Sequence, residues 1–323
     1  MELCLMIEGQ EGVTWEQWRA IARACEQHGV RTLFRSDHYL SLDGADAGPG
    51  SLHRERVGRG SLDAWATIAG LAAVTDTLRL GTLVSPATFR HPSELARLAA
   101  TADQISGGRI ELGLGAGWHE REHQAHGFEF PDLRTRMEIL QEQLEIVHGS
   151  WADGTFSFSG AHYSLSDLDA LPKPVQRPHP PLIMGGSAGP RACALAARYA
   201  DEYNLLATTI KEIREQKARV TAACEGAARD PIPVSVMAPI VVGLDADDLR
   251  ARVERVALAA GEDPRTLRSD SPDGWVVGLV DEVAERLADW REEGVSRVMF
   301  QHLAHEDLAF VALLGAVLAP LLA

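Results

Sequence analysis

Ser36-Asp37-His38 is the first motif in the chain whose residue types could transfer protons. It directly follows a β-rich run, and an aspartate beside a histidine can exchange protons near neutral pH. In that interpretation Asp37 orients the imidazole of His38, which faces a ligand. In the other interpretation the motif is a turn in which the aspartate accepts hydrogen bonds from backbone amides. The residues alone leave both interpretations open.

A second motif, His119-Glu-Arg-Glu-His123, matches the His-Glu-x-x-His pattern of zinc proteases. In those enzymes two imidazoles one helical turn apart bind the metal, and the glutamate acts as a base. Here a glycine-rich turn comes first, and the flanking residues lack the apolar stripe of a buried helix. We therefore expect no metal site, and a zinc hydrolase is an alternative that this context disfavours.

Two glycine-rich segments could let a ligand approach the backbone. Leu112-Gly-Leu-Gly-Ala-Gly-Trp118 differs from the dinucleotide pattern, because its third glycine comes one residue early and its strand is the fourth. We expect these glycines to let a ligand approach the end of that strand. Ile183-Met-Gly-Gly-Ser-Ala-Gly-Pro-Arg191 runs from a strand into a helix. This segment predicts a phosphate site, because its glycines leave the backbone accessible, Ser187 offers a hydroxyl and the helix N-terminus offers amide donors. A flexible turn is the alternative.

His302 and His305 form a pair beyond the last predicted strand. Both could line a substrate pocket or lie in a solvated loop, and we take His302 as the candidate pocket residue.

A repeated pattern of helix, glycine and strand predicts the elements that hold these residues. Residues 25–34 and 290–300 each read as a helix end, a glycine suited to the left-handed conformation, and a strand. Strands that alternate with helices indicate a parallel sheet. The eight predicted strands are residues 2–7, 32–36, 78–84, 109–115, 181–185, 202–206, 233–242 and 296–300. They predict an α/β fold, a (β/α)8 TIM barrel with catalytic groups at the C-terminal ends of its strands. An open doubly wound sheet is the alternative.

Two insertions interrupt this rhythm. Residues 41–60, after the second strand, are rich in Gly, Asp, Arg and Ser and predict a loop. Residues 150–180, after the fourth strand, predict a β-hairpin followed by a proline-rich crossing segment. Since no low-complexity linker divides the chain, residues 1–323 are predicted to form one domain.

The composition restricts the possible partners and compartment. A net charge of -15 would repel the phosphates of nucleic acids. No apolar run reaches the roughly 18–20 residues of a membrane helix, and residues 1–7 read as a strand rather than a signal peptide. The four cysteines form no Cys-x-x-Cys pair, which fits a reducing compartment. We expect a cytoplasmic protein with a small-molecule substrate and neither a nucleic acid nor a membrane partner. The sequence leaves the oligomeric state undetermined, and a homodimer is one possible state.

Taken in order along the chain, several segments resemble the luciferase-like family of flavin and deazaflavin oxidoreductases. The resemblance is best to the branch that uses coenzyme F420, a deazaflavin. The matching segments are residues 29–38, 80–85, 88–92 and 106–118, then Glu122, Gly127, Phe130 and Pro131, and finally residues 180–186 and 196–201.

The resemblance implies a (β/α)8 barrel whose cofactor lies at the C-terminal end of the strands. It implies an oxidoreductase that moves hydride between coenzyme F420 and a small organic substrate; a monooxygenase that uses reduced FMN is the alternative. It further implies that His38 and Asp37 lie near the ring and that the Leu83–Val84 peptide is cis and backs the ring. The implied cofactor contacts are Leu83, Val84, Ser85, Gly115, Ala116 and Gly117, with Gly185, Gly186 and Ser187 near the phosphate.

One residue departs from the sugar-phosphate dehydrogenases of this family. Where those enzymes have a glutamate that acts as an acid, this chain has Trp118, and few lysines are present to bind a phosphate. The departure puts a sugar-phosphate substrate in doubt and favours Trp118 as the wall of an apolar pocket. A cofactor-free barrel that only binds a ligand is a further alternative.

Overall fold

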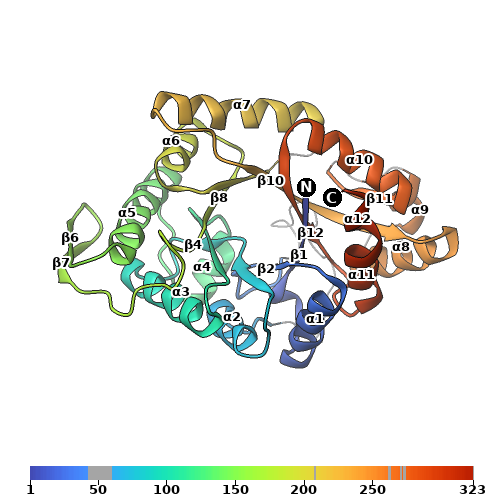
Figure 1. Cartoon of the computed structure of the whole chain (residues 1–323), viewed down its shortest axis with the longest axis horizontal. Coiled ribbons are helices and arrows are strands. Elements are labelled where there is room, and N and C mark those ends of the chain that lie inside the picture. The colour runs from blue at the N-terminus through green and yellow to red at the C-terminus, as the bar shows by residue number, and fades with distance from the viewer. Residues whose placement is uncertain (43–59, 207–208, 261–262, 270, 272–273, 323) are drawn as a thin grey trace.

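The computed structural model describes the chain except residues 43–59, 207–208, 261–262, 270, 272–273 and 323 (Figure 1). Its centre is a closed barrel of parallel strands in the order β1-β2-β3-β5-β8-β9-β10-β12, and β12 pairs again with β1. The strands are β1 (Glu2–Ile7), β2 (Thr32–Arg35), β3 (Arg79–Thr82), β5 (Ile110–Gly115), β8 (Leu182–Gly186), β9 (Glu202–Leu205), β10 (Val234–Gly243) and β12 (Val295–Gln301). Each overlaps a strand predicted from the sequence. The barrel prediction is therefore confirmed, and the open sheet is wrong.

Helices form a ring around the strands, as Figure 1 shows. Thr14 and Gln17 form the capping box that starts α1, and Gly29 ends this helix in the left-handed conformation, with φ of 78°. No described helix is long and apolar enough to cross a membrane. The larger helices are α1 (Trp15–His28), α2 (Ala64–Ala72), α3 (Pro92–Ser106), α5 (Leu133–Trp151), α6 (Pro190–Tyr199), α7 (Ile210–Gly226), α8 (Ala246–Ala260) and α10 (Val280–Glu292).

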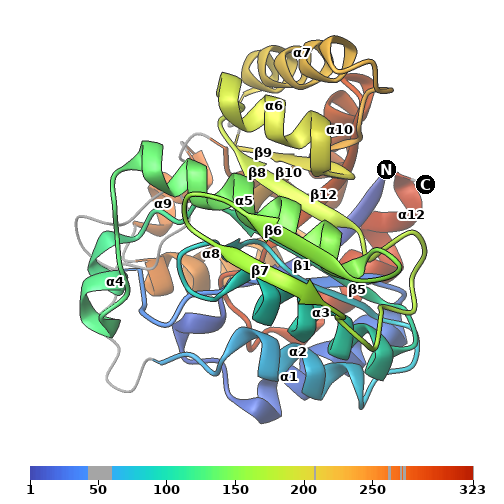
Figure 2. The ribbon, with the colours of Figure 1, turned by 90° about the vertical axis from the view of Figure 1, so that its left-hand side faces the viewer.

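Shorter elements complete the chain. The smaller helices are α4 (Glu120–His126), α9 (Pro264–Ser269), α11 (Leu308–Leu313) and α12 (Ala319–Leu321), with a 3-10 turn at Gly9–Glu11 and a π-helical turn at Leu314–Leu318. The short strands β4 (Ser85–Pro86) and β11 (Val276–Leu279) extend the sheet at β5 and β10. The antiparallel hairpin β6 (Phe156–Ser159) and β7 (Ser164–Leu168) lies outside the barrel against α5 (Figure 2). It falls within residues 150–180, where the sequence predicts a hairpin. The predicted loop at 41–60 lies almost wholly outside the described residues.

A charged network fills the N-terminal end of the barrel interior. Arg297 of β12 lies 2.8 Å from Glu111 of β5 and 2.8 Å from Glu202 of β9. Arg79 of β3 lies 2.7 Å from Glu111. Burial would raise the pKa of Glu111, but the charges of Arg297 and Arg79 outweigh it and hold that pKa below its usual value. Each buried carboxylate is thus paired, as a charge in a barrel core must be.

Two glycines of β5 make room for the segment that follows β3. A Cβ atom at position 113 would lie 2.1 Å from the carbonyl oxygen of Thr82, and one at position 115 would lie 2.8 Å from Cγ2 of Val84. The sequence assigns this space to a ligand. The structure fills the side-chain space of Gly113 and Gly115 with the Thr82 backbone and the Val84 side chain. That a ligand also approaches the backbone at the end of this strand stays a prediction.

We predict that Gly113→Ala lowers the free energy of unfolding by about 1–3 kcal/mol, because the added methyl group meets backbone that cannot turn away. Gly226→Ala, at the end of α7, is the matched control, since a Cβ there has no neighbour within 4 Å. Urea unfolding followed by circular dichroism measures both. Equal stability of the two variants would contradict the packing argument.

Candidate active site

Several side chains singled out from the sequence meet at the barrel mouth, the end of the barrel where the parallel strands finish. His38 follows β2, Ser85 lies on β4, and Trp118 follows β5. Helix α4, which comes next, brings Glu122 to the same place. The parallel barrel explains this convergence, because all of its strands end at one face.

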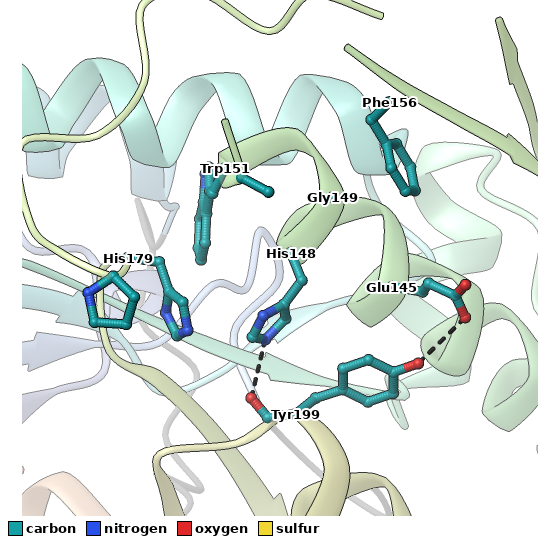
Figure 3. Close-up of a pocket in the computed structure, with 9 residues that line it drawn as sticks. Glu145, His148, Gly149, Trp151, Phe156, His179 and Tyr199 are labelled. Carbon is teal, nitrogen blue, oxygen red and sulfur yellow. Dashed lines mark hydrogen bonds between the residues drawn. The ribbon is translucent and has the colours of Figure 1, made fainter. Parts of the chain in front are cut away.

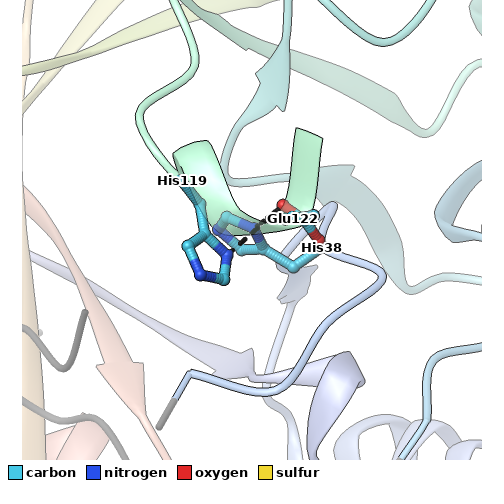
Figure 4. Close-up of side chains that lie close together, drawn as sticks. All are labelled: His38, His119 and Glu122. Atoms are coloured by element: carbon cyan, nitrogen blue, oxygen red, sulfur yellow. Dashed lines mark hydrogen bonds and ion pairs between the residues drawn. The ribbon is translucent and has the colours of Figure 1, made fainter. Parts of the chain in front are cut away.

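A hydrogen-bonded pair at the mouth joins His38 to Glu122 (Figure 4). Nδ1 of His38 lies 2.8 Å from Oε2 of Glu122, whose side chain is fully buried. The other carboxylate oxygen, Oε1, accepts the backbone N–H of Leu40 at 2.9 Å and that of Tyr39. One carboxylate therefore fixes both the ring of His38 and the backbone that follows it.

The two groups stabilise each other's charged forms. Burial alone would lower the pKa of His38, but the hydrogen bond and charge of Glu122 outweigh it, so the pKa is raised. Burial would likewise raise the pKa of Glu122, yet His38 and the backbone amides of Leu40 and Tyr39 hold it below its usual value. The pair thus favours an imidazolium beside a carboxylate, with Nε2 as the ring nitrogen that faces away from Glu122.

Asp37 does not contact the ring that it was expected to orient. Its Oδ2 accepts a hydrogen bond from Ser85 Oγ at 2.6 Å and lies 2.6 Å from Arg90, whose second nitrogen reaches Oδ1 at 3.2 Å. Arg90 also binds Asp63 at 2.8 Å. Asp37 therefore ties β2 to the segment after β3, and the ring's partner is Glu122. The sequence did contain a signal for Glu122, since it stands one helical turn from His119 and matches the luciferase-like family, but neither pattern paired it with His38.

In the His-Glu-x-x-His motif, neighbouring protein groups contact both ring nitrogens of the second histidine, His123. Nδ1 of His123 lies 2.7 Å from the carbonyl oxygen of His119, and Nε2 lies 2.6 Å from Thr88 Oγ1. Both ring nitrogens of His123 are engaged, and burial lowers the pKa of His123, which favours its neutral form.

A different trio brings possible metal ligands together. One ligand atom from each of His38, His119 and Glu122 lies within 4.8 Å of the others, and His119 Nδ1 is 3.6 Å from Glu122 Oε2. Among the described residues this is the group whose atoms could hold an ion. The short contact between His38 Nδ1 and Glu122 Oε2 also suits a hydrogen bond that holds a proton on His38. The absence of a metal stays a prediction.

Trp118 lies beside these rings with half of its side chain in solvent. It is 52% exposed, stacks on His119 at a centroid distance of 5.2 Å and meets His38 edge-on at 5.5 Å. An exposed indole at a barrel mouth suits contact with an apolar ligand. Its place in a substrate pocket stays a prediction.

The backbone near the mouth has the conformation that the family resemblance implies. The Leu83–Val84 peptide is cis. Leu83 belongs to the apolar cluster of the barrel interior, and Val84 packs against that cluster.

The loop between β8 and α6, where the sequence predicts a phosphate site, combines an uncapped helix start with a nearby guanidinium. Helix α6 begins after Gly189 without a side-chain cap, so its first amide groups lack that partner. The guanidinium of Arg219 reaches this loop from α7, with Nε 3.0 Å from the carbonyl oxygen of Ala188 and a terminal nitrogen 3.2 Å from that of Ser187. A Cβ atom at Gly185 would meet only ordinary van der Waals contacts, the nearest at 3.4 Å. The backbone of this strand end is therefore less crowded than that of Gly113 and Gly115.

His302 is buried at the end of β12 rather than solvated. Its side chain is 4% exposed and stacks on Phe310 at 4.4 Å. Burial, with the neighbouring His305, lowers the pKa of His302 to about 3, so the ring is neutral. Nε2 has no hydrogen-bond partner among the described residues. A buried acceptor of this kind suits a donor group on a ligand.

A buried polar network next to this site was missed from the sequence. Glu8 follows β1 and accepts hydrogen bonds from Gln301 at 2.5 Å and from Gln10 at 2.8 Å. Gln10 in turn accepts one from Ser36 Oγ at 2.5 Å. The position of Glu8 in the sequence could have indicated this network, because Glu8 directly follows β1 as the Ser36-Asp37-His38 motif directly follows β2.

Comparison with known proteins places the chain among enzymes of one family. Residues 4–297 match the family model described as luciferase-like monooxygenase. The Mycobacterium tuberculosis protein Rv0953c is 29% identical over 310 residues, 93% of each chain. The FMNH2-dependent dimethylsulfone monooxygenase of Pseudomonas putida is 27% identical over 73% of each chain. The F420-dependent hydroxymycolic acid dehydrogenase of M. tuberculosis is 29% identical over 72% of this chain and 60% of that protein.

A solved structure agrees with the fold. An F420-dependent secondary alcohol dehydrogenase superposes with a TM-score of 0.80 over the whole of both chains, at 19% identity. Since its identity is low, this likeness supports the barrel alone, whereas the family model matches most of this chain. The chain therefore belongs to the luciferase-like monooxygenase family and is one of its flavin- or deazaflavin-dependent oxidoreductases.

Proposed function

We propose that the protein transfers hydride between a deazaflavin of the coenzyme F420 type and a small organic substrate. The observation that carries this proposal is the His38–Glu122 pair at the barrel mouth. When bound, the deazaflavin supplies the carbon that gives or takes the hydride, while the protein supplies orientation and proton transfer. Hydride transfer to or from a carbon–oxygen bond also requires a proton at the oxygen, which an imidazole of raised pKa can provide.

His38 acts through Nε2 in this proposal. Nδ1 is held by Glu122 at 2.8 Å, which keeps a proton on that nitrogen and turns the opposite nitrogen away from the carboxylate. Glu122 is a positioning residue that stabilises the imidazolium. Asp37 has a structural role in this proposal, because Arg90 and Ser85 contact both of its carboxylate oxygens.

The chain offers a place for each end of the cofactor. We assign the ring to the mouth, against Leu83, Val84 and Ser85, and the phosphate to the β8–α6 loop. An uncapped helix start and the Arg219 guanidinium support the phosphate assignment, since both favour an anion. The proposed contacts along this path also include Gly115, Ala116 and Gly117 on one side and Gly185, Gly186 and Ser187 on the other.

The substrate is proposed to lie between Trp118 and His302. The exposed indole offers an apolar face, and the unpaired Nε2 of His302 can accept one hydrogen bond. The alternative function is an FMN-dependent monooxygenase, which the P. putida relative supports. An anion site at the β8–α6 loop would serve either cofactor, so the cofactor requires a direct test.

We predict that the protein binds coenzyme F420 at least about tenfold more tightly than FMN, a difference of about 1.4 kcal/mol in binding free energy. Fluorescence titration of the purified protein with each cofactor measures both dissociation constants. Equal or reversed affinities would support the monooxygenase instead.

We predict that His38→Ala loses about 100-fold or more in turnover, because a general acid or base contributes this much. Its melting temperature should fall only modestly, because Glu122 loses one of its donors but keeps the backbone amides of Tyr39 and Leu40, and a polar group at a barrel mouth adds little core area. The assay uses whichever alcohol or ketone the wild type converts fastest in a panel. A large loss of stability at a normal rate would show that His38 is only structural.

We predict that Glu122→Gln lowers the pKa of His38 from above its usual value to below that value, because burial then acts without the compensating charge. Histidine NMR titration measures the change, with the His38 signal assigned from its absence in His38→Gln. The stability that this pair contributes is present between the lowered pKa of Glu122 and the raised pKa of His38, because both groups are charged there. It is lost as pH rises through the raised pKa of His38 and as pH falls through the lowered pKa of Glu122.

Glu120→Gln is the control for this titration, because Glu120 lies exposed on the same helix. An unchanged His38 pKa in Glu122→Gln would remove the physical basis of the proposed proton transfer.

A further inference from the structure

A cavity of about 420 Å³ lies outside the barrel, where the end of α5 meets the end of α6 (Figure 3). Helix α5, the start of β6, the segment before β8 and the last residue of α6 all contribute to it. The lining residues on which the argument depends are Glu145, His148, Trp151, His179 and Tyr199.

This cavity lies at the end of the barrel opposite the candidate active site. Tyr199 comes shortly before β9 begins, and His179 shortly before β8 begins. His38 and Glu122, by contrast, follow the ends of β2 and β5. A molecule in the cavity is therefore remote from the groups proposed to transfer protons, and it would be bound rather than converted.

The cavity presents aromatic rings whose polar atoms are engaged elsewhere. Trp151 Nε1 donates to the carbonyl oxygen of Ala96 at 3.1 Å, and His148 Nε2 lies 3.0 Å from that of Tyr199. His179 stacks on Trp151 at 5.8 Å, and His148 meets His179 edge-on at 4.6 Å. Ring faces and edges are thus the main surface offered to a ligand.

The charge of the lining is negative. Glu145 is its one carboxylate, and the set contains no lysine or arginine. The Tyr199 hydroxyl donates to Oε2 of Glu145 at 3.2 Å, which fixes the acid beside the ring. Burial, together with His179, lowers the pKa of His148, so that ring adds no positive charge. Negative charge beside aromatic faces favours a cation over an anion.

One cation of the protein already uses the rim of this site. The guanidinium of Arg198 lies over the Tyr199 ring, 4.9 Å from its centroid, and 3.9 Å from Oε2 of Glu145. The Arg198 side chain is largely exposed, so this contact is weak and can be displaced.

We propose that the cavity binds a small organic cation, an ammonium group with apolar substituents, through the rings of Trp151 and Tyr199 and the carboxylate of Glu145. The substituents contact the ring faces, and the charge is attracted by the ring quadrupoles and by Glu145. The proposal does not depend on the function assigned to the barrel mouth.

The first test compares choline with its uncharged analogue 3,3-dimethylbutan-1-ol, which has the same shape. Isothermal titration of the full chain at pH 8, where imidazoles are largely neutral, is expected to give choline at least about tenfold tighter binding. No detectable choline binding, or equal affinity for the two probes, would overturn the proposal.

The second test replaces Glu145 and Arg198, whose side chains are partly exposed, and Tyr199, which belongs to the buried core, so that its variant needs a stability control. Glu145→Gln and Tyr199→Leu should each weaken choline binding about fivefold or more, because each removes an attraction for the charge. Arg198→Gln should strengthen it, because the competing guanidinium is gone. Glu138→Gln, seven residues earlier on α5 and outside the cavity, is the matched control and should bind as the wild type does.

Melting temperatures show whether each variant is folded, and the Glu145 and Arg198 substitutions alter partly exposed side chains. Weaker binding in Arg198→Gln, or unchanged binding in Glu145→Gln, would contradict the assigned roles.

Discussion

Closure of the sheet by hydrogen bonding between its first and last strands is the constraint on which the rest of the structure depends. β12 pairs with β1 from Glu2 to Met6, so residues near the two ends of the chain become neighbours. Closure removes sheet edges and forces all eight strands to finish at one face. Glu8 and Gln301, which are nearly 300 residues apart, can hydrogen-bond only because of this pairing.

At that face a single carboxylate organises the candidate active site. Glu122 joins the loop after β2 to the helix after β5, since it accepts backbone amides from one and is carried by the other. The same group holds the ring of His38 and raises its pKa. A position that would read from sequence as a surface glutamate on a short helix is thus a buried anion, stabilised by three donors. Its burial is costly unless all of these partners are present.

The two ends of the barrel have different chemistry. The mouth holds titratable pairs and a loop suited to an anion, whereas the cavity at the opposite end has aromatic walls and one carboxylate. Helices that run back from the mouth end near that cavity, so one scaffold can position both sites. Catalysis at one end and ligand recognition at the other need share no side chain.

The sequence by itself determined the strands, the barrel and the segments that reach the mouth. Those properties follow from local patterns, such as the glycine after His28 that ends α1 before β2. It also placed His38, Trp118 and the β8–α6 loop at the C-terminal ends of strands, because each comes shortly after a strand that the sequence predicts. It did not identify the partner of His38: adjacency favoured Asp37, but Asp37 binds Arg90 and Ser85, and Glu122 comes from 84 residues away. It likewise did not predict the packing role of Gly113 and Gly115, since Thr82 and Val84 lie where their side chains would be. Such pairings depend on which side chains of different strands face each other, and that is decided by barrel register and packing rather than by any local pattern.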